Sequence, residues 1–292
     1  MIINFGSLNI DYVYSMKKIV KPGETLSSKN LNVFPGGKGL NQSVALARAG
    51  ACVKHAGFVE MGDASFLMDI LEESGVDISL MKSVTETNGH AIIQVEESGE
   101  NCILLYGGTN RLIDEHYVKN VSQYVKPGDL ILFQNETSAI AEMMYCAKEK
   151  GARIALNPSP MDEDCLALPL ELVDIFILNE IEGERLTGEQ KPDNIMNGMR
   201  KRFAGAKIVL TLGSEGSMFS DKEYGFTYSA EKCDEIVDTT AAGDTFTGYY
   251  LAGIEAGLDD KAAIARATKA AAICITRMGA APSIPQKDEV EK

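Results

Sequence analysis

The 292-residue chain is short of positive charge. It has 28 Lys and Arg residues against 42 Asp and Glu residues, which gives a formal charge of −14 and a pI near 4.8. Proteins that wrap nucleic acid or lie on acidic membranes need a basic stripe or face. We therefore expect neither nucleic acid nor a membrane among the partners of this protein.

The sequence also lacks the marks of export, of a membrane span and of a cysteine or histidine metal site. Its six cysteines are scattered without any C-x-x-C spacing, and its three histidines lie far apart. No cationic segment precedes an apolar run at the N-terminus, and no uncharged apolar stretch reaches about 18 residues. We expect a cytoplasmic protein with free thiols and no histidine-based metal site.

What the sequence does contain indicates a compact fold. Apolar residues make up 45% and charged residues 24% of the chain, which is ordinary for globular proteins. Short β-rich runs alternate with helical patterns such as 138–150 and 193–203. This alternation predicts a parallel sheet with helices on both faces. The clearest runs are residues 2–5, 129–133, 153–156, 174–178 and 207–212.

Two stretches break this rhythm. Residues from about 12 to 34 and from about 89 to 105 alternate polar and apolar positions. Each stretch contains a turn sequence, KPGE at 21–24 and ESGE at 97–100. We expect hairpin strands that form a small accessory sheet.

The segment 238–258 is the most informative for function. Apolar residues recur after Asp244 and predict a buried helix that begins at about Gly243, preceded by Ala241 and Ala242. These small residues leave backbone N–H groups open, and a helix N-terminus of this kind binds anions, phosphate above all. Asp244 itself fits either of two roles, a helix-capping carboxylate or the base of a phosphoryl transfer.

Other polar residues follow predicted strands. Asn9 and Asp11 come after the first strand, and Glu136 comes after the strand 129–133. Because ligands bind outside the carboxyl ends of strands in open α/β sheets, these side chains could meet in a sugar site. Capping of their own loops is the alternative for each. The glycine-rich run PGGKGLNQ at 35–42, in which Asn41 would open a helix, is not a Walker sequence and could be a ligand loop or a tight turn.

Two further segments leave alternatives open. Asn179 and Glu182 stand three apart at the start of a predicted helix, where they could hold a hydrated Mg²⁺ or cap the helix. TLGSEG at 211–216 ends a strand in a turn that could admit a nucleotide or could be a plain hairpin.

Taken together, nine segments in order along the chain resemble the ribokinase family of carbohydrate kinases, also called the PfkB family. The segments are GSLNID (6–11), PGETL (22–26), PGGKGLNQ (35–42), YGGTN (106–110), NPSP (157–160), NEIEGERLTG (179–188), TLGSEG (211–216), TTAAGDTFTG (239–248) and TRMGAAPSIP (276–285). The resemblance implies a ribokinase-like three-layer α/β/α sandwich with a mainly parallel central sheet and a small β-sheet lid. It also implies one domain over residues 1–292, with lid strands from about 12–34 and 89–105.

The implied activity is ATP-dependent sugar phosphorylation, with D-ribose as the leading acceptor and O5 as the phosphorylated atom. Fructose, 2-keto-3-deoxygluconate and nucleosides are acceptors of other family members and remain alternatives. A sugar or nucleotide sensor without catalysis is the alternative from a different class. The resemblance further implies Mg²⁺, K⁺ or another monovalent cation, and a homodimer that forms through the lid.

The resemblance also assigns roles residue by residue. Asp244 corresponds to the catalytic base, and the anion hole to Ala241, Ala242 and Gly243. Sugar-binding positions are Asn9, Asp11, Gly37, Lys38, Asn41, Glu136 and Asp244. Nucleotide positions are Asn179, Thr211, Gly213, Ser214, Gly216, Gly243 and Thr268. Glu182 matches the acid that acts on Mg²⁺ through water, and the monovalent-cation positions are Asp238, Thr240, Cys274, Arg277, Gly279 and Ser283. Thr268 and Cys274 depart from the residues that are frequent in the family, Asn or His and Ala.

Overall fold

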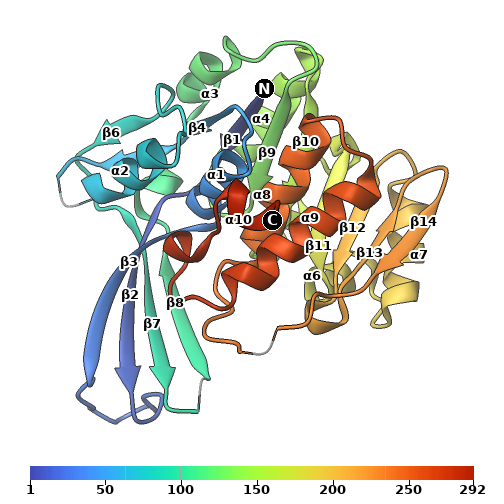
Figure 1. The fold of residues 1–292 in the computed structure, drawn as a ribbon. Coiled ribbons are helices and arrows are strands. Elements are labelled where there is room, and N and C mark those ends of the chain that lie inside the picture. Colours follow the sequence, from blue (N-terminus) through green and yellow to red (C-terminus); the bar gives the residue numbers. More distant parts are fainter. Residues whose placement is uncertain (63, 99, 234) are drawn as a thin grey trace.

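The computed structural model describes residues 1–62, 64–98, 100–233 and 235–292. A main sheet of eight strands runs through the middle of the molecule (Figure 1). Neighbouring strands from β12 to β4 are parallel, whereas β13 and β14 continue the sheet in antiparallel fashion. In spatial order the strands are β14 (Gly225–Tyr228), β13 (Ser217–Ser220), β12 (Lys207–Thr211), β11 (Ile175–Asn179), β10 (Arg153–Asn157), β9 (Leu130–Gln134), β1 (Ile2–Phe5) and β4 (Val53–Ala56).

Both faces of the main sheet are buried. Along β9, Leu130 and Leu132 belong to one apolar cluster, whereas Ile131 and Phe133 belong to the other. Successive side chains of a strand point to opposite faces, so a strand that is apolar throughout must be covered on both sides. The result is the three-layer α/β/α arrangement that the sequence predicts.

Different helices cover the two faces. The first cluster is completed by α1 (Lys38–Arg48), α2 (Ser65–Glu73), α8 (Ala242–Glu255), α9 (Asp260–Cys274) and α10 (Lys287–Val290). The second is completed by α3 (Glu115–Ser122), α4 (Ile140–Glu149), α6 (Glu180–Thr187) and α7 (Pro192–Arg202). The short elements are α5 (Glu163–Leu166), η1 (Gly108–Arg111), η2 (Leu170–Leu172), η3 (Gly213–Glu215), η4 (Ala281–Ser283) and the strand pair β5 (Phe58–Glu60) and β6 (Lys82–Val84).

A second sheet of four strands, here called the lid sheet, projects from the body (Figure 1). Its order is β3 (Asn30–Gly36), β2 (Asn9–Met16), β7 (Gly89–Glu96) and β8 (Asn101–Tyr106). The predicted accessory sheet is therefore present. Two details differ: β2 begins at Asn9 rather than at about residue 12, and the hairpins β2–β3 and β7–β8 join through a parallel β2–β7 pair.

Two local expectations are wrong. The helix expected to open at Asn41 begins at Lys38, because Gly37 at φ 91° turns the chain into the helix three residues earlier. The polar composition of the tail QKDEVEK at 286–292 predicts a loosely held end of the chain, but the tail contains α10, and Val290 is buried in the first apolar cluster. The helix expected from about Gly243 begins at Ala242, which agrees with the expectation.

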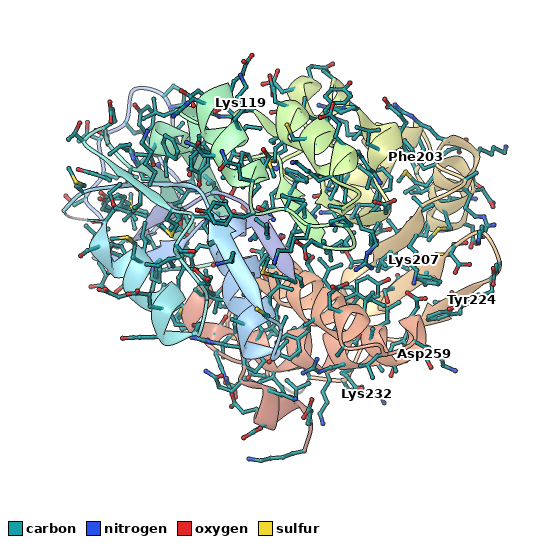
Figure 2. All side chains as sticks on the ribbon, turned by 90° about the horizontal axis from the view of Figure 1, so that it is seen from above. Lys119, Phe203, Lys207, Tyr224, Lys232 and Asp259 are labelled. Atoms are coloured by element: carbon teal, nitrogen blue, oxygen red, sulfur yellow. The ribbon has the colours of Figure 1, made fainter. Side chains whose placement is uncertain are left out.

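Asp260 holds together the edge of the main sheet that lies away from the lid sheet. Its carboxylate accepts hydrogen bonds from Lys207 Nζ at 2.8 Å, Tyr250 OH at 2.9 Å and Tyr224 OH at 3.1 Å. Figure 2 shows Lys207 and Tyr224 together at this edge, with Asp259 of the neighbouring helix cap beside them. These contacts tie the start of α9 to β12 and to α8.

No helix within the described ranges is both long enough and apolar enough to cross a lipid bilayer.

Candidate active site

Polar residues end four neighbouring strands of the main sheet. Gln134, Asn157, Asn179 and Thr211 are the last residues of β9, β10, β11 and β12. The register pairs Asn157 with Gln134 and Asn179 with Thr211, so these ends lie along one edge. This edge is where open α/β sheets bind ligands.

Asp244 lies beside this edge, in the first turn of α8, and is buried. Its Oδ2 accepts a hydrogen bond from Asn41 Nδ2 at 2.9 Å, and its Oδ1 accepts one from Gln42 Nε2 at 2.8 Å. The N-cap of α8 is Ala241, and no side chain caps the helix. The structure therefore excludes the helix-capping role for Asp244, whose carboxylate is instead bonded to two amides of α1.

The start of α8 has an unusual backbone. Ala241 adopts the left-handed conformation at φ 62°, which costs free energy in a residue with a side chain and is concentrated at functional sites. The first N–H groups of a helix have no acceptor within it and carry the positive end of the helix dipole. The next residues, Ala242 and Gly243, carry no bulky side chain, and the Ala242 N–H donates to Thr239 O at 3.3 Å. A helix start of this kind suits an anion, and the anion hole stays a prediction.

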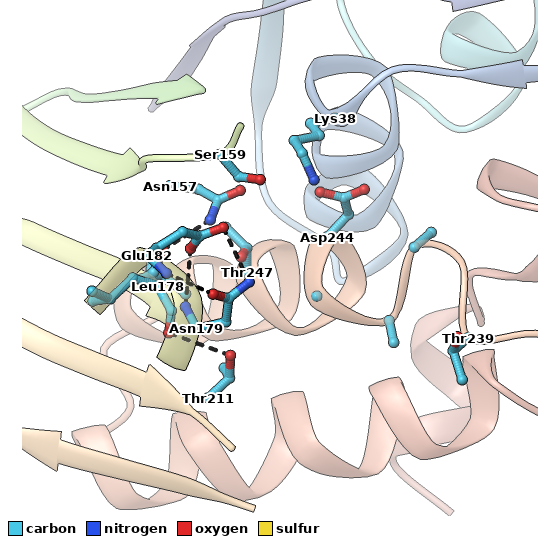
Figure 3. Close-up of a pocket in the computed structure, with 14 residues that line it drawn as sticks. Lys38, Asn157, Ser159, Leu178, Asn179, Glu182, Thr211, Thr239, Asp244 and Thr247 are labelled. Atoms are coloured by element: carbon cyan, nitrogen blue, oxygen red, sulfur yellow. Dashed lines mark hydrogen bonds between the residues drawn. The ribbon is translucent and has the colours of Figure 1, made fainter. Parts of the chain in front are cut away.

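A pocket of about 250 Å³ opens onto this helix start (Figure 3). In the figure the Lys38 side chain points toward Asp244, while Glu182, Asn157 and Asn179 lie on the opposite wall. The lining residues are Lys38, Asn157, Ser159, Ile177, Leu178, Asn179, Glu182, Thr211, Thr239, Ala241, Ala242, Gly243, Asp244 and Thr247. Cationic, amide and carboxylate groups thus surround the N-terminus of α8.

A second pocket, of about 520 Å³, adjoins the first. Both pockets are lined by Thr211, Thr239, Ala242 and Gly243, so the start of α8 lies where they meet. The other lining residues of the second pocket include the predicted nucleotide positions Gly213, Ser214, Gly216 and Thr268, with Ala230, Glu231, Lys232, Cys233, Ile236, Phe246, Ala271, Ala272 and Ile275. The turn 211–216 both joins the antiparallel pair β12–β13 and lines this pocket, so its two interpretations are compatible.

Of the predicted sugar positions, Asn41 hydrogen-bonds to Asp244, and Lys38 lines the first pocket with it. Asn9, Asp11, Gly37, Asn41 and Glu136 line neither of the two pockets. Glu136 is buried, and its Oε2 accepts hydrogen bonds from the Ser7 hydroxyl and from the Lys38 backbone N–H, the latter at 2.9 Å. Asn9 is buried at the start of β2, where its Oδ1 accepts a hydrogen bond from Asn110 Nδ2 at 2.8 Å. Gly37, the N-cap of α1, precedes Lys38 directly.

Charges in this part of the site perturb one another. Burial, with the nearby Glu136 and Asp244, raises the pKa of Asp11 to about 7. Burial also raises the pKa of Glu136, although Lys38 and Ser7 oppose the change. Burial disfavours the charged form of Lys38, but Asp244, Glu136 and Glu182 together leave its pKa above the ordinary value. The site therefore concentrates carboxylates around one cation.

Asn179 and Glu182 form a capping box at the start of α6. Asn179 Oδ1 accepts the Glu182 N–H at 3.0 Å, and Glu182 Oε2 accepts the Asn179 N–H at 2.9 Å. The helix-cap interpretation of this pair is thus confirmed. Glu182 nevertheless lines the first pocket, and burial raises the pKa of its carboxyl group above the ordinary range.

The structure brings together two segments that are far apart in the sequence, 238–240 and 274–283. The Asp238 carboxylate accepts hydrogen bonds from the N–H groups of Thr240 at 2.9 Å and Gly279 at 3.0 Å. Cys274 Sγ lies 3.0 Å from Ser283 Oγ in the same loop pair. These are five of the six predicted monovalent-cation positions.

The sixth position, Arg277, differs. Its guanidinium forms an ion pair with Glu289 of α10 at 2.5 Å. Because this side chain is engaged elsewhere, Arg277 can face the loop pair only through its backbone.

Several residues at the site received no role from the sequence. Gln42 and Gln134 are buried and Asn157 is partly buried. Gln134 and Asn157 each hydrogen-bond to Gln42, which in turn donates to Asp244. Asn110 supports Asn9 in the same way. Each of these residues except Gln134 lies inside a segment that carries the family resemblance, and this is the signal that could have drawn attention to it.

The fold and the site define a class: a mainly parallel α/β protein in which one helix start joins two pockets beside a buried carboxylate. Residues 1–287 match the pfkB family of carbohydrate kinases. The chain belongs to this family and is a carbohydrate kinase.

Relatives of this chain include named and structurally characterised proteins. Ribokinase from Haemophilus influenzae is 35% identical over 294 residues, which covers 97% of this chain and 95% of that protein. The crystal structure of ribokinase from Cryptococcus neoformans var. grubii serotype A in complex with ADP is 30% identical, with a TM-score of 0.87 and coverage of 99% and 98%. The structure of Arabidopsis thaliana ribokinase with ribose and ATP is 27% identical, with a TM-score of 0.85 and coverage of 99% and 97%.

Proposed function

We propose that this kinase transfers the γ-phosphoryl group of ATP to O5 of D-ribose, which gives D-ribose 5-phosphate and ADP. The position of Asp244 carries this proposal. Its carboxylate is buried at the helix start that joins the two pockets, so a hydroxyl on one side and a nucleotide on the other would meet beside it. The names of the ribokinase relatives support ribose as the acceptor and ATP as the donor.

In this mechanism Asp244 orients the acceptor hydroxyl and receives its proton. Phosphoryl transfer needs little proton removal before the new bond is nearly formed, so a carboxylate is an adequate base. The N–H groups at Ala241 to Gly243 would stabilise the negative charge of the transferring group. Lys38 points toward Asp244 and adds positive charge on the acceptor side.

The predicted sugar site favours a neutral polyol. Asp11, Glu136 and Asp244 supply carboxylate oxygens, which accept hydrogen bonds from hydroxyls. Asn41 Nδ2 donates to Asp244, whereas Asn41 Oδ1 is buried and has no hydrogen-bond partner among the described residues. A sugar hydroxyl would satisfy this oxygen. An acid such as 2-keto-3-deoxygluconate would bring a further carboxylate into this cluster, which is electrostatically unfavourable.

The second pocket is the proposed nucleotide site. Its wall of Ile236, Phe246, Ala271 and Ile275 suits an apolar base face, and the pocket extends to Ala242 and Gly243 at the start of α8, where phosphates would lie. Thr268 Oγ1 is buried in this wall without a partner in the structure and is available to the base.

Mg²⁺ and a monovalent cation complete the proposed site. No group of three or more His, Cys, Asp and Glu side chains that could hold a metal occurs among residues 1–62, 64–98, 100–233 and 235–292. A Mg²⁺ ion held by water and phosphate oxygens, with Glu182 as the nearby carboxylate, fits this donor set. It would neutralise phosphate charge when bound. We place K⁺ at the loop pair of Asp238 and Gly279, where backbone carbonyls would be its main ligands.

We also propose a homodimer through the lid sheet. Leu31, Val33, Ile103 and Leu104 are between 48% and 67% exposed on this sheet. Apolar groups gathered on a projecting sheet indicate a protein contact.

The six cysteines are all free, which is consistent with the reducing cytoplasm in which we place the protein.

A panel of acceptors tests the proposed substrate. ADP release is measured with ribose, other pentoses, fructose, 2-keto-3-deoxygluconate and nucleosides at equal concentration in the presence of ATP and Mg²⁺. We expect the highest kcat/KM with ribose and the lowest with the sugar acid. Higher kcat/KM with another acceptor would refute ribose as the substrate, and binding of ribose and ATP without any ADP release would refute catalysis.

A further inference from the structure

A chain of buried amides lies behind Asp244. Gln42 Nε2 donates to Asp244 Oδ1 at 2.8 Å and to Asn157 Oδ1 at 3.0 Å. Gln42 Oε1 accepts from Gln134 Nε2 at 2.7 Å, and Gln134 Nε2 also donates to Asn4 Oδ1 at 3.0 Å. Gln42, Gln134 and Asn4 are each at most 1% exposed. The chain thus connects Asp244 to β9 and β1 of the main sheet through buried groups.

The first end of this chain determines how the Gln42 amide is turned. Asn4 Nδ2 donates at 2.7 Å to the backbone carbonyl of Gly39, which can only accept. Asn4 Oδ1 must therefore face Gln134, and Gln134 must present its NH₂ group to Asn4. The same NH₂ group then donates to Gln42, whose Oε1 must therefore be the acceptor. The Gln42 NH₂ group is left to face Asp244.

A second, independent end leads to the same orientation. Asn157 Nδ2 donates at 2.9 Å to the backbone carbonyl of Ile177. Asn157 Oδ1 therefore faces Gln42 and requires a donor there, which is again Nε2. Both hydrogens of the Gln42 NH₂ group are thus assigned, one to Asn157 and one to Asp244.

The hydrogen bonds on the other side of Asn4, through Ser43 and His55, also have only one possible direction. His55 Nε2 lies 3.2 Å from the Gly6 carbonyl and must donate to it, so Nδ1 accepts from Ser43 Oγ at 2.8 Å. Ser43 Oγ in turn accepts from Asn4 Nδ2 at 2.8 Å. Burial lowers the pKa of His55 to about 4, so the ring is neutral at physiological pH and holds this pattern.

We propose that Gln42 is the positioning residue of the catalytic base. Asn41 and Gln42, consecutive residues of α1, each hold one oxygen of Asp244, so the carboxylate cannot rotate about its Cβ–Cγ bond. One lone pair on each oxygen is left for the acceptor hydroxyl. The network behind Gln42 keeps a donor, and never an acceptor, against Asp244 Oδ1. This role depends on the proposed function of Asp244 as the base.

The first test replaces Gln42 by Met, which has similar length but no hydrogen-bonding NH₂ group. We expect kcat to fall on the order of 10- to 100-fold, because a misplaced catalytic group costs about this much, while KM for the sugar changes less than about threefold. Gln123→Met, at an exposed position, is the matched control and retains the wild-type rates. Thermal melting reports whether each variant is folded.

The second test replaces Gln42 by Glu and measures kcat/KM against pH. Four charged side chains interact electrostatically with Asp244 and therefore also influence this experiment. They are Lys38, Glu136, Asp11 and Glu182. A carboxyl group placed against the Asp244 carboxylate must share a proton with it, so the acid limb of the profile moves to higher pH by about one unit or more. A residue that only fills space would lower the rate at all pH values and leave the limb in place.

A third variant keeps the proposal falsifiable if substitution of Gln42 prevents folding. Gln134→Met removes one of the two groups that orient the Gln42 amide and leaves its buried Oε1 without a donor, while both direct contacts of Asp244 remain. We expect a several-fold loss of kcat. Wild-type kcat in folded Gln42→Met or Gln134→Met, or an unmoved acid limb in Gln42→Glu, overturns the role of Gln42 while the wild-type enzyme remains active. An inactive wild-type enzyme overturns the proposed function, and with it this role.

Discussion

At the scale of single residues, the buried carboxyl group of Asp11 lowers the stability of the sugar-free protein once it is ionised. Asp11 is 9% exposed beside Glu136 and Asp244, and its pKa is raised to about 7. Between its unfolded value of about 3.8 and about 7, the folded state binds more protons than the unfolded state. The free energy of unfolding therefore falls as pH rises through this window. Above pH 7, an ionised Asp11 destabilises the sugar-free protein.

Asp11→Asn should reverse this penalty. The amide is neutral at every pH, so we expect the sugar-free variant to melt about 5 °C higher than the wild type at pH 8 and higher by roughly half as much or less at pH 5. Melting curves at the two pH values, with Asp69→Asn at an exposed position as the control, measure the difference. Equal melting temperatures at pH 8 would show that the buried carboxylate costs no stability. The KM for the sugar should rise in the same variant.

Single residues also show how far sequence reasoning reaches. Asp244 could be identified because the signal is local: small residues, a carboxylate and an apolar helix in one segment. Gln134 could not, because nothing around it in the sequence points to Asp244. Only the register of β9 with β10, and the packing of α1 on α8, bring its amide into the chain behind the base.

At the scale of elements, the site depends on how closely α1 and α8 approach. A Cβ atom added to Gly248 of α8 would lie 2.4 Å from Ala45 Cβ and 2.8 Å from the backbone N of Leu46. Contacts this short are not tolerated, so only glycine permits this spacing. The same two helices carry Asn41, Gln42 and Asp244, so their distance sets the contacts of the proposed base.

Gly248→Ala should therefore impair both stability and catalysis. Overpacking outweighs the better helix propensity of alanine, and we expect a net loss of about 1–2 kcal/mol in the free energy of unfolding. We also expect a lower kcat, because α8 must move away from α1. Gly205→Ala is the matched control, since a Cβ there meets nothing within 4 Å. Urea unfolding measures the free energy of unfolding, and steady-state kinetics measure kcat. A Gly248→Ala variant that matches the control in both would contradict this account.

Elements were predicted well where a local pattern exists. The strand expected at 2–5 is β1, and those expected at 129–133 and 207–212 are β9 and β12 within one residue at each end. The parallel pairing of β2 with β7 was not predicted, because about 80 residues separate the partners and no local pattern records such a contact. The earlier start of α1 depends on the backbone of Gly37, which residue types alone leave open.

At the scale of the whole molecule, the exposed lid sheet is the feature that a single chain leaves unexplained. The register places Leu104 opposite Ile92, Ile92 opposite Tyr12, and Tyr12 opposite Val33. Paired residues share a face, so these four side chains form one apolar row across the sheet. Leu104 and Val33, at the two ends of the row, are 67% and 48% exposed. A second copy of the chain would cover them.

Leu104→Lys should separate the proposed dimer. A charge in an apolar interface must be desolvated without a partner, so we expect the variant to be monomeric at micromolar concentration. The wild type should scatter light as a species of twice the 31.6 kDa chain mass. Tyr145→Lys, at an exposed apolar residue of α4 in the body, should stay dimeric. A monomeric wild type would contradict the proposed contact.

The net charge also has to be judged at this scale. A chain of charge −14 is proposed to bind an anionic nucleotide, and the conflict is resolved locally. We expect the N–H groups at the start of α8, with Lys38 and the proposed Mg²⁺, to supply the local positive charge that a nucleotide needs where the two pockets meet. Net charge therefore argues against large polyanionic partners but not against a small anion held by backbone dipoles.

The central claim is that the enzyme transfers a phosphoryl group from ATP to O5 of ribose, with Asp244 as the base that receives the proton of this hydroxyl. The most direct measurement is ³¹P NMR of a reaction with ribose, ATP and Mg²⁺, run with the wild type and with Asp244→Asn. We predict equal amounts of ribose 5-phosphate and ADP from the wild type, and no product above background from a folded Asp244→Asn variant. Phosphate on another atom, no product from the wild type, or wild-type turnover by Asp244→Asn would contradict the claim.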